Sequence, residues 1–245
     1  MNDECPRGTY TSFGKKYSGE KAVISLTSWK ARITTVPKTL FSLLKQCPGF
    51  HIVLVLSEEE FPRMMGELPP DLILFVENEL IELLWVYKNY KSFKKILFTM
   101  DKYRDVPIIS ADDDCIYTCN YAQEMYNAWD VNKDCIITMH ACPVTHFQHG
   151  AATLYCPHAF CDLGIKFLAD ATILKTNHDD VYYGCLAETM GIKIIDIWSN
   201  VPRSKTPYFF HDDMEALSRG PTAYDTNSAT DIVRQQIKQD IQELL

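Results

Sequence analysis

The sequence lacks the features that mark several large classes of protein. None of its nine cysteines belongs to a C-x-x-C pair, so a structural zinc site has little support. No stripe of lysine and arginine is present to neutralise nucleic-acid phosphates, and the net charge of −8 argues against a nucleic-acid partner. No apolar stretch approaches the roughly 20 residues needed to cross a bilayer. These absences leave a soluble or surface-associated protein.

The cysteines and the start of the chain bear on the compartment. Residues 1–4 are acidic, whereas the first part of a secretory signal would be basic. The number of cysteines is odd, and they are spread through apolar segments such as residues 135–137. We therefore expect reduced thiols and a cytoplasmic location, with the inner face of the membrane left open.

The first half of the chain alternates strand-like and helix-like segments. Its 47% hydrophobic content is ample for a packed core, and we expect one domain. Strands are expected at residues 22–27, 51–56, 72–76 and 108–111, and helices at residues 37–47, 57–65 and 90–104. This alternation predicts an α/β fold with a mostly parallel central sheet flanked by helices, in which ligands bind at the carboxyl ends of the strands.

Three consecutive aspartates follow the last of these strands. Asp112, Asp113 and Asp114 repel one another, and a divalent cation or several N–H donors would offset their charge. Carboxylate oxygens favour Mg²⁺ or Mn²⁺ over Zn²⁺, and magnesium usually leaves coordination positions for phosphate and water. The sequence therefore suggests a metal-diphosphate site, although an acidic turn in solvent is the simpler alternative.

A second acidic cluster begins a predicted helix further along the chain. Asp179 and Asp180 precede a helix that runs to Gly191. Ionised carboxylates are stabilised at a helix N-terminus, so a capping role is one interpretation. The other is a general base toward an incoming hydroxyl. Displacement at a sugar anomeric carbon requires both a metal-binding acidic cluster and a general base.

The rest of the second half is less regular. Residues 135–139 read as a strand, and Tyr121, Met125 and Trp129 form a helical stripe that we assign to the core. The stretch from Thr230 predicts an amphipathic helix that docks on its own domain rather than on a membrane. Residues 211–213, His-Asp-Asp, are either a late metal ligand or a solvated loop.

Taken together, these motifs resemble the nucleotide-sugar glycosyltransferases of the GT-A fold, and more narrowly the bacterial group that builds surface polysaccharides. The resemblance covers about residues 21–200 and rests on segments 23–33, 93–95, 110–117, 179–182 and 191–193, in that order. It implies a GT-A domain spanning residues 1–245. Within it, residues 1–20 form an irregular arm, 21–119 a nucleotide-binding half, 120–210 a smaller mixed acceptor-side half, and 211–245 a tail.

The resemblance also implies roles for individual residues. Thr27, Ser28 and Arg32 would line the nucleotide pocket, and Lys95 would approach the nucleotide or diphosphate. Asp112 would face the ribose and share the divalent ion, Mn²⁺ or Mg²⁺, with Asp114, while Asp113 would contact sugar hydroxyls. Asp180 would be the base of an inverting enzyme, with Asp179 as the fallback.

The implied donor is a UDP-sugar, and the implied acceptor is a hydroxyl of a glycan or glycolipid. Peripheral membrane association and the oligomeric state stay open. Related sequences carry a run of glycines where this chain has Gly150-Ala151-Ala152, which leaves the sugar undetermined. A Mg²⁺-dependent phosphohydrolase and a non-catalytic nucleotide-sugar binding module are the alternatives.

Overall fold

The computed structural model describes residues 10–46, 48–139, 152–160, 179–199, 207–210 and 229–244. The strands in these ranges are β1 (Tyr10–Gly14), β2 (Ala22–Thr27), β3 (Phe50–Ser57), β4 (Glu82–Val86), β5 (Ile108–Ser110), β6 (Cys115–Tyr117), β7 (Ile136–Thr138), β8 (Thr153–Tyr155), β9 (Ile194–Asp196) and β10 (Tyr208–Phe210). The helices are α1 (Val36–Leu43), α2 (Pro70–Glu77), α3 (Lys94–Lys102), α4 (Tyr121–Asp130), α7 (Asp179–Thr189) and α8 (Ala229–Leu244).

Most of these strands form one central sheet. Its order is β1-β4-β3-β2-β5-β8-β7-β9. β1 and β8 run antiparallel to their neighbours, and the remaining strands of the sheet are parallel to one another. β6 and β10 form a separate antiparallel pair. The expected α/β fold with a mostly parallel central sheet flanked by helices is therefore confirmed.

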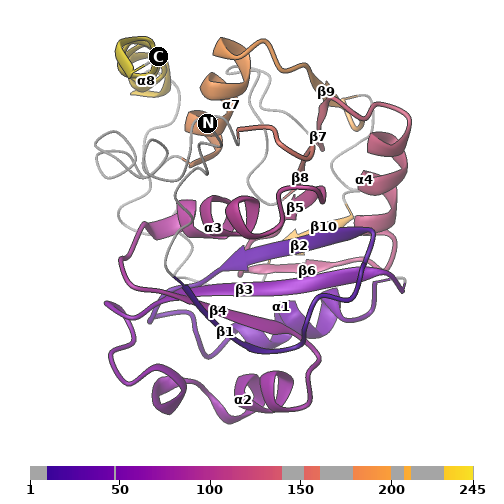
Figure 1. Cartoon of the computed structure of the whole chain (residues 1–245), viewed down its shortest axis with the longest axis vertical. Helices are drawn as coiled ribbons and strands as arrows, with labels where there is room; N and C mark the ends of the chain where they lie inside the picture. Colours follow the sequence, from indigo (N-terminus) through magenta and orange to yellow (C-terminus); the bar gives the residue numbers. More distant parts are fainter. Residues whose placement is uncertain are drawn as a thin grey trace, which may run out of the picture.

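The direction in which the sheet grows changes at β2. The chain adds β3 and β4 on one side of β2 and then returns to place β5 on the other side. Because crossovers between parallel strands are right-handed, this return moves the connecting helix to the other face of the sheet. Figure 1 shows this arrangement, with α1 and α2 on one face and α3 on the other. A crevice beyond the carboxyl ends of β2 and β5 is where such a sheet binds ligands.

One expected strand is wrong. The apolar run at residues 72–76 lies within α2, which begins with Pro70 at its first turn and has Asp71 there. Leu72 and Val76, one helical turn apart, are the residues of α2 that are buried, whereas Leu74 is exposed. The strand of this unit is β4, all of whose residues are buried. A short apolar run does not distinguish a strand from a helix, and here the prolines decide.

Two smaller differences concern the first half of the chain, and one prediction concerns α4. The arm expected to be irregular contains β1, which pairs with β4. The helix expected at residues 57–65 is replaced by a single 3₁₀ turn at Met64–Glu67. The core stripe on α4 is confirmed, because Tyr121, Met125 and Trp129 are all buried.

A buried polar network lies at the amino end of β4, opposite the ligand-binding edge. Glu82 is 1% exposed, and its carboxylate accepts hydrogen bonds from the Ser12 hydroxyl (2.5 Å), Lys102 and Tyr103. His51 Nε2 lies 2.7 Å from the same carboxylate. Burial alone would raise the pKa of Glu82, but these hydrogen bonds outweigh it and lower the pKa to about 2. An ionised carboxylate therefore ties β1, β3, β4 and α3 together.

The predicted C-terminal helix is present as α8. It packs against α7 (Figure 1) and buries Ile237 and Ile241. Lys238 Nζ lies 2.8 Å from a carboxylate oxygen of Glu188 on α7. The expected docking on the chain's own fold is thus confirmed for the described part of this helix. In the described ranges, no helix is both long enough and apolar enough to span a bilayer.

Candidate active site

The polar residues predicted from the sequence meet where β2 and β5 end. The two strands are paired, Ser25 beside Ser110, so the residues after each strand emerge at the same edge of the sheet. Ser28 follows β2 and is buried, as is Arg32 in the next turn. Asp112 to Asp114 follow β5. The fold therefore brings the two segments to one location at this edge.

The backbone of the aspartate turn is held by two hydroxyls. Thr39 Oγ1, on α1, lies 2.9 Å from the carbonyl oxygen of Asp113 and 2.8 Å from that of Cys115. The N–H of Asp112 donates to the Tyr117 hydroxyl at 2.8 Å. The roles of Thr39 on α1 and Tyr117 on β6 were not predicted, because no sequence pattern shows that these hydroxyls reach the backbone of the turn. Together they fix the direction in which the three carboxylates point.

Two of the three aspartates, Asp113 and Asp114, share the guanidinium group of Arg32. Arg32 Nη1 lies 2.5 Å from Asp113 Oδ1 and 3.5 Å from Asp114 Oδ2. The Ser28 hydroxyl donates to the other oxygen of Asp113 at 2.6 Å. Asp113 is therefore buried with both carboxylate oxygens hydrogen-bonded to residues that were expected to line the nucleotide pocket. This arrangement makes Asp113 a support for Ser28 and Arg32.

Asp114 lies further from its cation than its two neighbours do: 3.5 Å from Arg32, against 2.8 Å between Asp112 and Lys95 and 2.5 Å between Asp113 and Arg32. Burial and then the neighbouring carboxylate of Asp112 raise the pKa of Asp114 to about 6, against the opposing effect of Arg32. Burial also raises the pKa of Asp113, although Arg32 and Ser28 oppose the shift. Three carboxylates with so few cations leave an excess of negative charge that a further cation would relieve.

Lys95 connects this turn to the second acidic cluster. The residue lies in the first turn of α3 and is 4% exposed. Its Nζ donates to Asp112 Oδ1 at 2.8 Å and lies 3.0 Å from Asp179 Oδ2 at the start of α7. Burial alone would lower the pKa of Lys95, but the two carboxylates outweigh it and raise the pKa well above its usual range. The two acidic motifs thus form one site.

The acidic pair at the start of α7 occupies two environments. Asp179 is buried against Lys95, whereas Asp180 keeps some access to solvent. Asp180 Oδ1 accepts a hydrogen bond from the N–H of Val181 at 2.9 Å. Burial among neighbouring groups and the charge of Asp179 raise the pKa of Asp180 to about 7. A carboxylate with this pKa is suited to take up a proton near neutrality.

The donor set at this edge fits a hard divalent cation. Asp112 is 30% exposed at its side chain, and Asp114 has only the 3.5 Å contact with Arg32 to offset its charge. In the described ranges, no three His, Cys, Asp or Glu side chains converge as a complete ligand set. Mg²⁺ and Mn²⁺ take one or two carboxylates and complete their coordination with phosphate and water oxygens. Asp112 and Asp114 therefore suit an ion whose other ligands come with a diphosphate.

Some expected site residues are engaged elsewhere or lie outside the described residues. Thr27 is half-buried, and its hydroxyl donates to the carbonyl oxygen of Val55 at 2.7 Å. Gly150, Ala151 and His211 to Asp213 lie outside the described residues.

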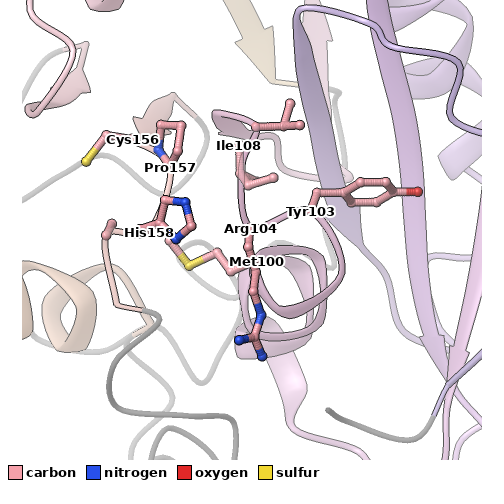
Figure 2. Close-up of a pocket in the computed structure, with 9 residues that line it drawn as sticks. Met100, Tyr103, Arg104, Ile108, Cys156, Pro157 and His158 are labelled. Atoms are coloured by element: carbon pink, nitrogen blue, oxygen red, sulfur yellow. The ribbon is translucent and has the colours of Figure 1, made fainter. Parts of the chain in front are cut away.

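A second hollow lies at the other end of β5. Figure 2 shows it between α3 and the segment after β8, lined by side chains that include Met100, Ile108, Cys156 and His158. It is too shallow to enclose a water molecule. Because Ile108 begins β5 and Asp112 follows its end, this hollow is at the opposite edge of the sheet from the acidic site. Its described lining residues include no aspartate or glutamate to hold a divalent metal ion.

Comparisons with known proteins relate this fold to a class of enzymes. No family model matches the sequence, and no curated protein matches it. A mannosyltransferase from Pyrobaculum calidifontis, PcManGT, solved with GDP-Man and Mn²⁺, superposes with a TM-score of 0.53 at 9% identity over 79% of this chain. The chain has a glycosyltransferase fold. TarS of S. aureus, residues 1–349 with UDP-GlcNAc, aligns over 49% of this chain and 34% of its own at 12% identity, but its TM-score of 0.38 is too low to carry an argument.

The superposition on the mannosyltransferase is informative about the fold. At 9% identity the superposition establishes the GT-A-type fold and no more, and the aligned part spans 60% of the mannosyltransferase. The fold that the sequence motifs implied is confirmed.

Proposed function

We propose that the protein is a metal-dependent glycosyltransferase that moves a sugar from a nucleotide-sugar donor to an acceptor hydroxyl. One observation carries the proposal: Lys95 places the aspartate turn and the acidic pair of α7 within one site, with Asp112 and Asp179 both at 3.0 Å or less from its Nζ. Sugar transfer needs a cation site for the leaving diphosphate and a base for the acceptor, close together.

The donor side is formed by the edge between β2 and β5. Asp112 and Asp114 would hold the Mn²⁺ or Mg²⁺ ion, and when bound this ion neutralises charge on the departing diphosphate. Ser28 and Arg32, oriented by Asp113, form the wall of the nucleotide pocket. We take UDP as the first nucleotide to test and GDP as the second. The mannosyltransferase of the same fold was solved with GDP-Man.

The acceptor side is formed by the start of α7. Asp180 accepts the proton of the acceptor hydroxyl at its carboxylate, which its pKa of about 7 allows near neutrality. The hydroxyl then attacks the anomeric carbon on the face opposite the diphosphate, which inverts its configuration. Inversion requires that the base activates the acceptor hydroxyl and that no side chain of the enzyme forms a covalent bond with the sugar.

The acceptor is taken from the sequence resemblance, and the cell compartment is taken from the cysteines. A hydroxyl of a bacterial glycan or glycolipid is the proposed acceptor, and the cytoplasm, extending to the inner face of the membrane, is the proposed location. The described cysteines Cys115, Cys119, Cys135, Cys156 and Cys185 are free thiols, which agrees with a reducing compartment.

The donor site is tested by ligand-induced stabilisation. UDP or GDP with Mn²⁺ should raise the melting temperature of the wild type, because a ligand bound by the folded state stabilises it by mass action. Asp114→Ala should lose the metal-dependent part of this increase. Asp71→Ala, an exposed aspartate on α2, is the matched control and should keep it. An increase of equal size in Asp114→Ala would show that the ion is held elsewhere.

The base is tested by turnover. Asp180→Asn should bind donor and metal as the wild type does and should transfer no sugar, and NMR of the wild-type product should show an inverted anomeric centre. Sugar transfer by Asp180→Asn would show that Asp180 is not the base. Donor-induced stabilisation without product from any acceptor would identify a binding module. Hydrolysis of simple phosphomonoesters would identify a phosphohydrolase.

A further inference from the structure

The Lys95 ammonium group is buried and contacts two carboxylates of the protein. Its side chain is 5% exposed, and two of its three N–H donors face Asp112 and Asp179. A lysine that binds a diphosphate needs to present its charge to the ligand. Here the charge is enclosed between two carboxylates that belong to segments far apart in the sequence.

The contact with Asp179 determines which acid of the pair is available. Successive residues in the first turn of a helix point about 100° apart, so fixing the Asp179 side chain toward Lys95 directs Asp180 away from it. The exposures follow the same order, because Asp179 is buried and Asp180 is half-buried. The pair is therefore divided into Asp179, which is anchored by Lys95, and Asp180, which points in another direction.

Aromatic packing surrounds the same junction and gives it a fixed spacing. Phe93, which precedes Lys94 and Lys95, has its ring centroid 5.5 Å from that of Tyr182 and 5.7 Å from that of Tyr183. These rings hold the beginning of α3 against the first turns of α7. The apolar contact sets the distance between the helices but has no direction that would orient a carboxylate, whereas the ion pair of Lys95 has one.

From this geometry we infer that Lys95 is a positioning residue: it joins Asp112 to Asp179 and thereby points Asp180 at the acceptor, rather than binding the donor itself. The inference rests on the proposed transferase function and specifies how its base is oriented. Asp179, the alternative base, has an anchoring role in this scheme. Misplacing a reacting group by about 1 Å can lower a rate on the order of 100-fold, so the effect should be large.

The neighbouring lysine supplies a matched control. Lys94 is as deeply buried as Lys95 and lies in the same helical turn, but its Nζ contacts Glu60 (3.0 Å) and Asn89 (2.5 Å). Among the described residues, it interacts with the acidic site only through the charge of Asp113. Lys94→Met and Lys95→Met therefore remove the same buried charge at adjacent positions. Lys95→Arg keeps a cation that can contact two carboxylates.

The experiment compares kcat and the donor KM of these variants. We expect Lys95→Met to lower kcat by roughly 100-fold with the donor KM within about threefold of wild type, Lys95→Arg to recover part of the loss, and Lys94→Met to keep kcat within about threefold. If Lys95→Met instead raises the donor KM tenfold at unchanged kcat, Lys95 is a donor ligand and the inference is wrong. It is equally wrong if Lys94→Met loses as much kcat as Lys95→Met.

A second measurement separates this inference from the proposed function and does not need activity. Amide hydrogen exchange in the first turns of α7 should become faster in Lys95→Met than in Lys94→Met, because the α7 terminus loses its anchor. Asp179→Asn, which keeps the size of the side chain, should show the same faster exchange and covers the case that Lys95→Met does not fold. Wild-type protein that transfers no sugar refutes the proposed function, whereas unchanged exchange in both variants refutes the anchoring.

Discussion

Replacing Glu82 by glutamine should destabilise the protein strongly while leaving its shape unchanged. Glutamine has the size of glutamate but replaces one carboxylate oxygen by an NH₂ group. In the wild type, Ser12 and Lys102 donate to one oxygen of Glu82, and Tyr103 donates to the other, beside His51 Nε2. Whichever oxygen is replaced, an NH₂ group then faces donors in a site that is 1% exposed.

The pKa of Glu82 gives the size of the effect. A shift from the usual 4.5 to about 2 means that the folded state favours the ionised carboxylate by about 3 kcal/mol, at 1.36 kcal/mol for each pKa unit. Because the folded-state pKa is lowered, this stabilisation is present above about pH 4.5 and is lost as the pH falls toward 2. We expect Glu82→Gln to lower the free energy of unfolding by about 3 kcal/mol at neutral pH.

Urea unfolding followed by far-UV circular dichroism measures the difference. The gap between wild type and variant should be equal at about pH 7 and about pH 5, and smaller by more than 1 kcal/mol near pH 3.5, where the unfolded wild type takes up a proton at Glu82. Glu77→Gln, an exposed change of the same chemistry at the end of α2, should shift stability by less than about 0.5 kcal/mol.

Two results would refute this reasoning. Equal stability of Glu82→Gln and wild type at neutral pH would mean that the donors around Glu82 find other partners at no cost. A gap of constant size down to pH 3.5 would mean that the pKa of Glu82 is not lowered, and that the loss comes from packing alone.

Three further predictions concern the site and the C-terminal helix. Since Asp180 must be ionised to act as a base, kcat/KM should rise with pH to a plateau with a midpoint near 7, and a midpoint near 4 would contradict its raised pKa. Asp113→Ala leaves the buried Arg32 without its closest carboxylate and should cost about 3–5 kcal/mol in urea unfolding, whereas Asp71→Ala should cost little. Ile241→Ala should lower the free energy of unfolding by about 2–5 kcal/mol and speed hydrogen exchange in α7 and α8, and unchanged stability and exchange would contradict the packing of Ile241 against α7.

Much of the fold could be predicted because its signals are local. Each predicted strand at residues 22–27, 51–56 and 108–111 is a mainly apolar run without strict alternation, typical of a parallel sheet buried on both faces. The aspartate turn was predictable because it follows such a run directly. β4 was missed because a buried glutamate, Glu82, begins it, and the stronger apolar run nearby belongs to α2.

The rest of the site depends on contacts that the sequence does not encode locally. Nothing near Lys95 in the sequence shows that it contacts both Asp112 and Asp179, because three separate elements have to fold before those atoms meet. The sequence predicted the residue types of the site but assigned Asp113 and Lys95 to the ligand. In the structure both residues contact other site residues, and their roles toward a ligand stay predictions.

The hydroxyls that hold the aspartate turn have a consequence for affinity. Thr39 and Tyr117 fix its backbone, and Arg32 and Lys95 already restrain its side chains, before any ligand arrives. A rigid recognition loop loses little conformational entropy on association, so more of the contact energy is retained as binding free energy. Loosening this loop by Thr39→Val would therefore weaken ligand binding even though Thr39 touches no ligand.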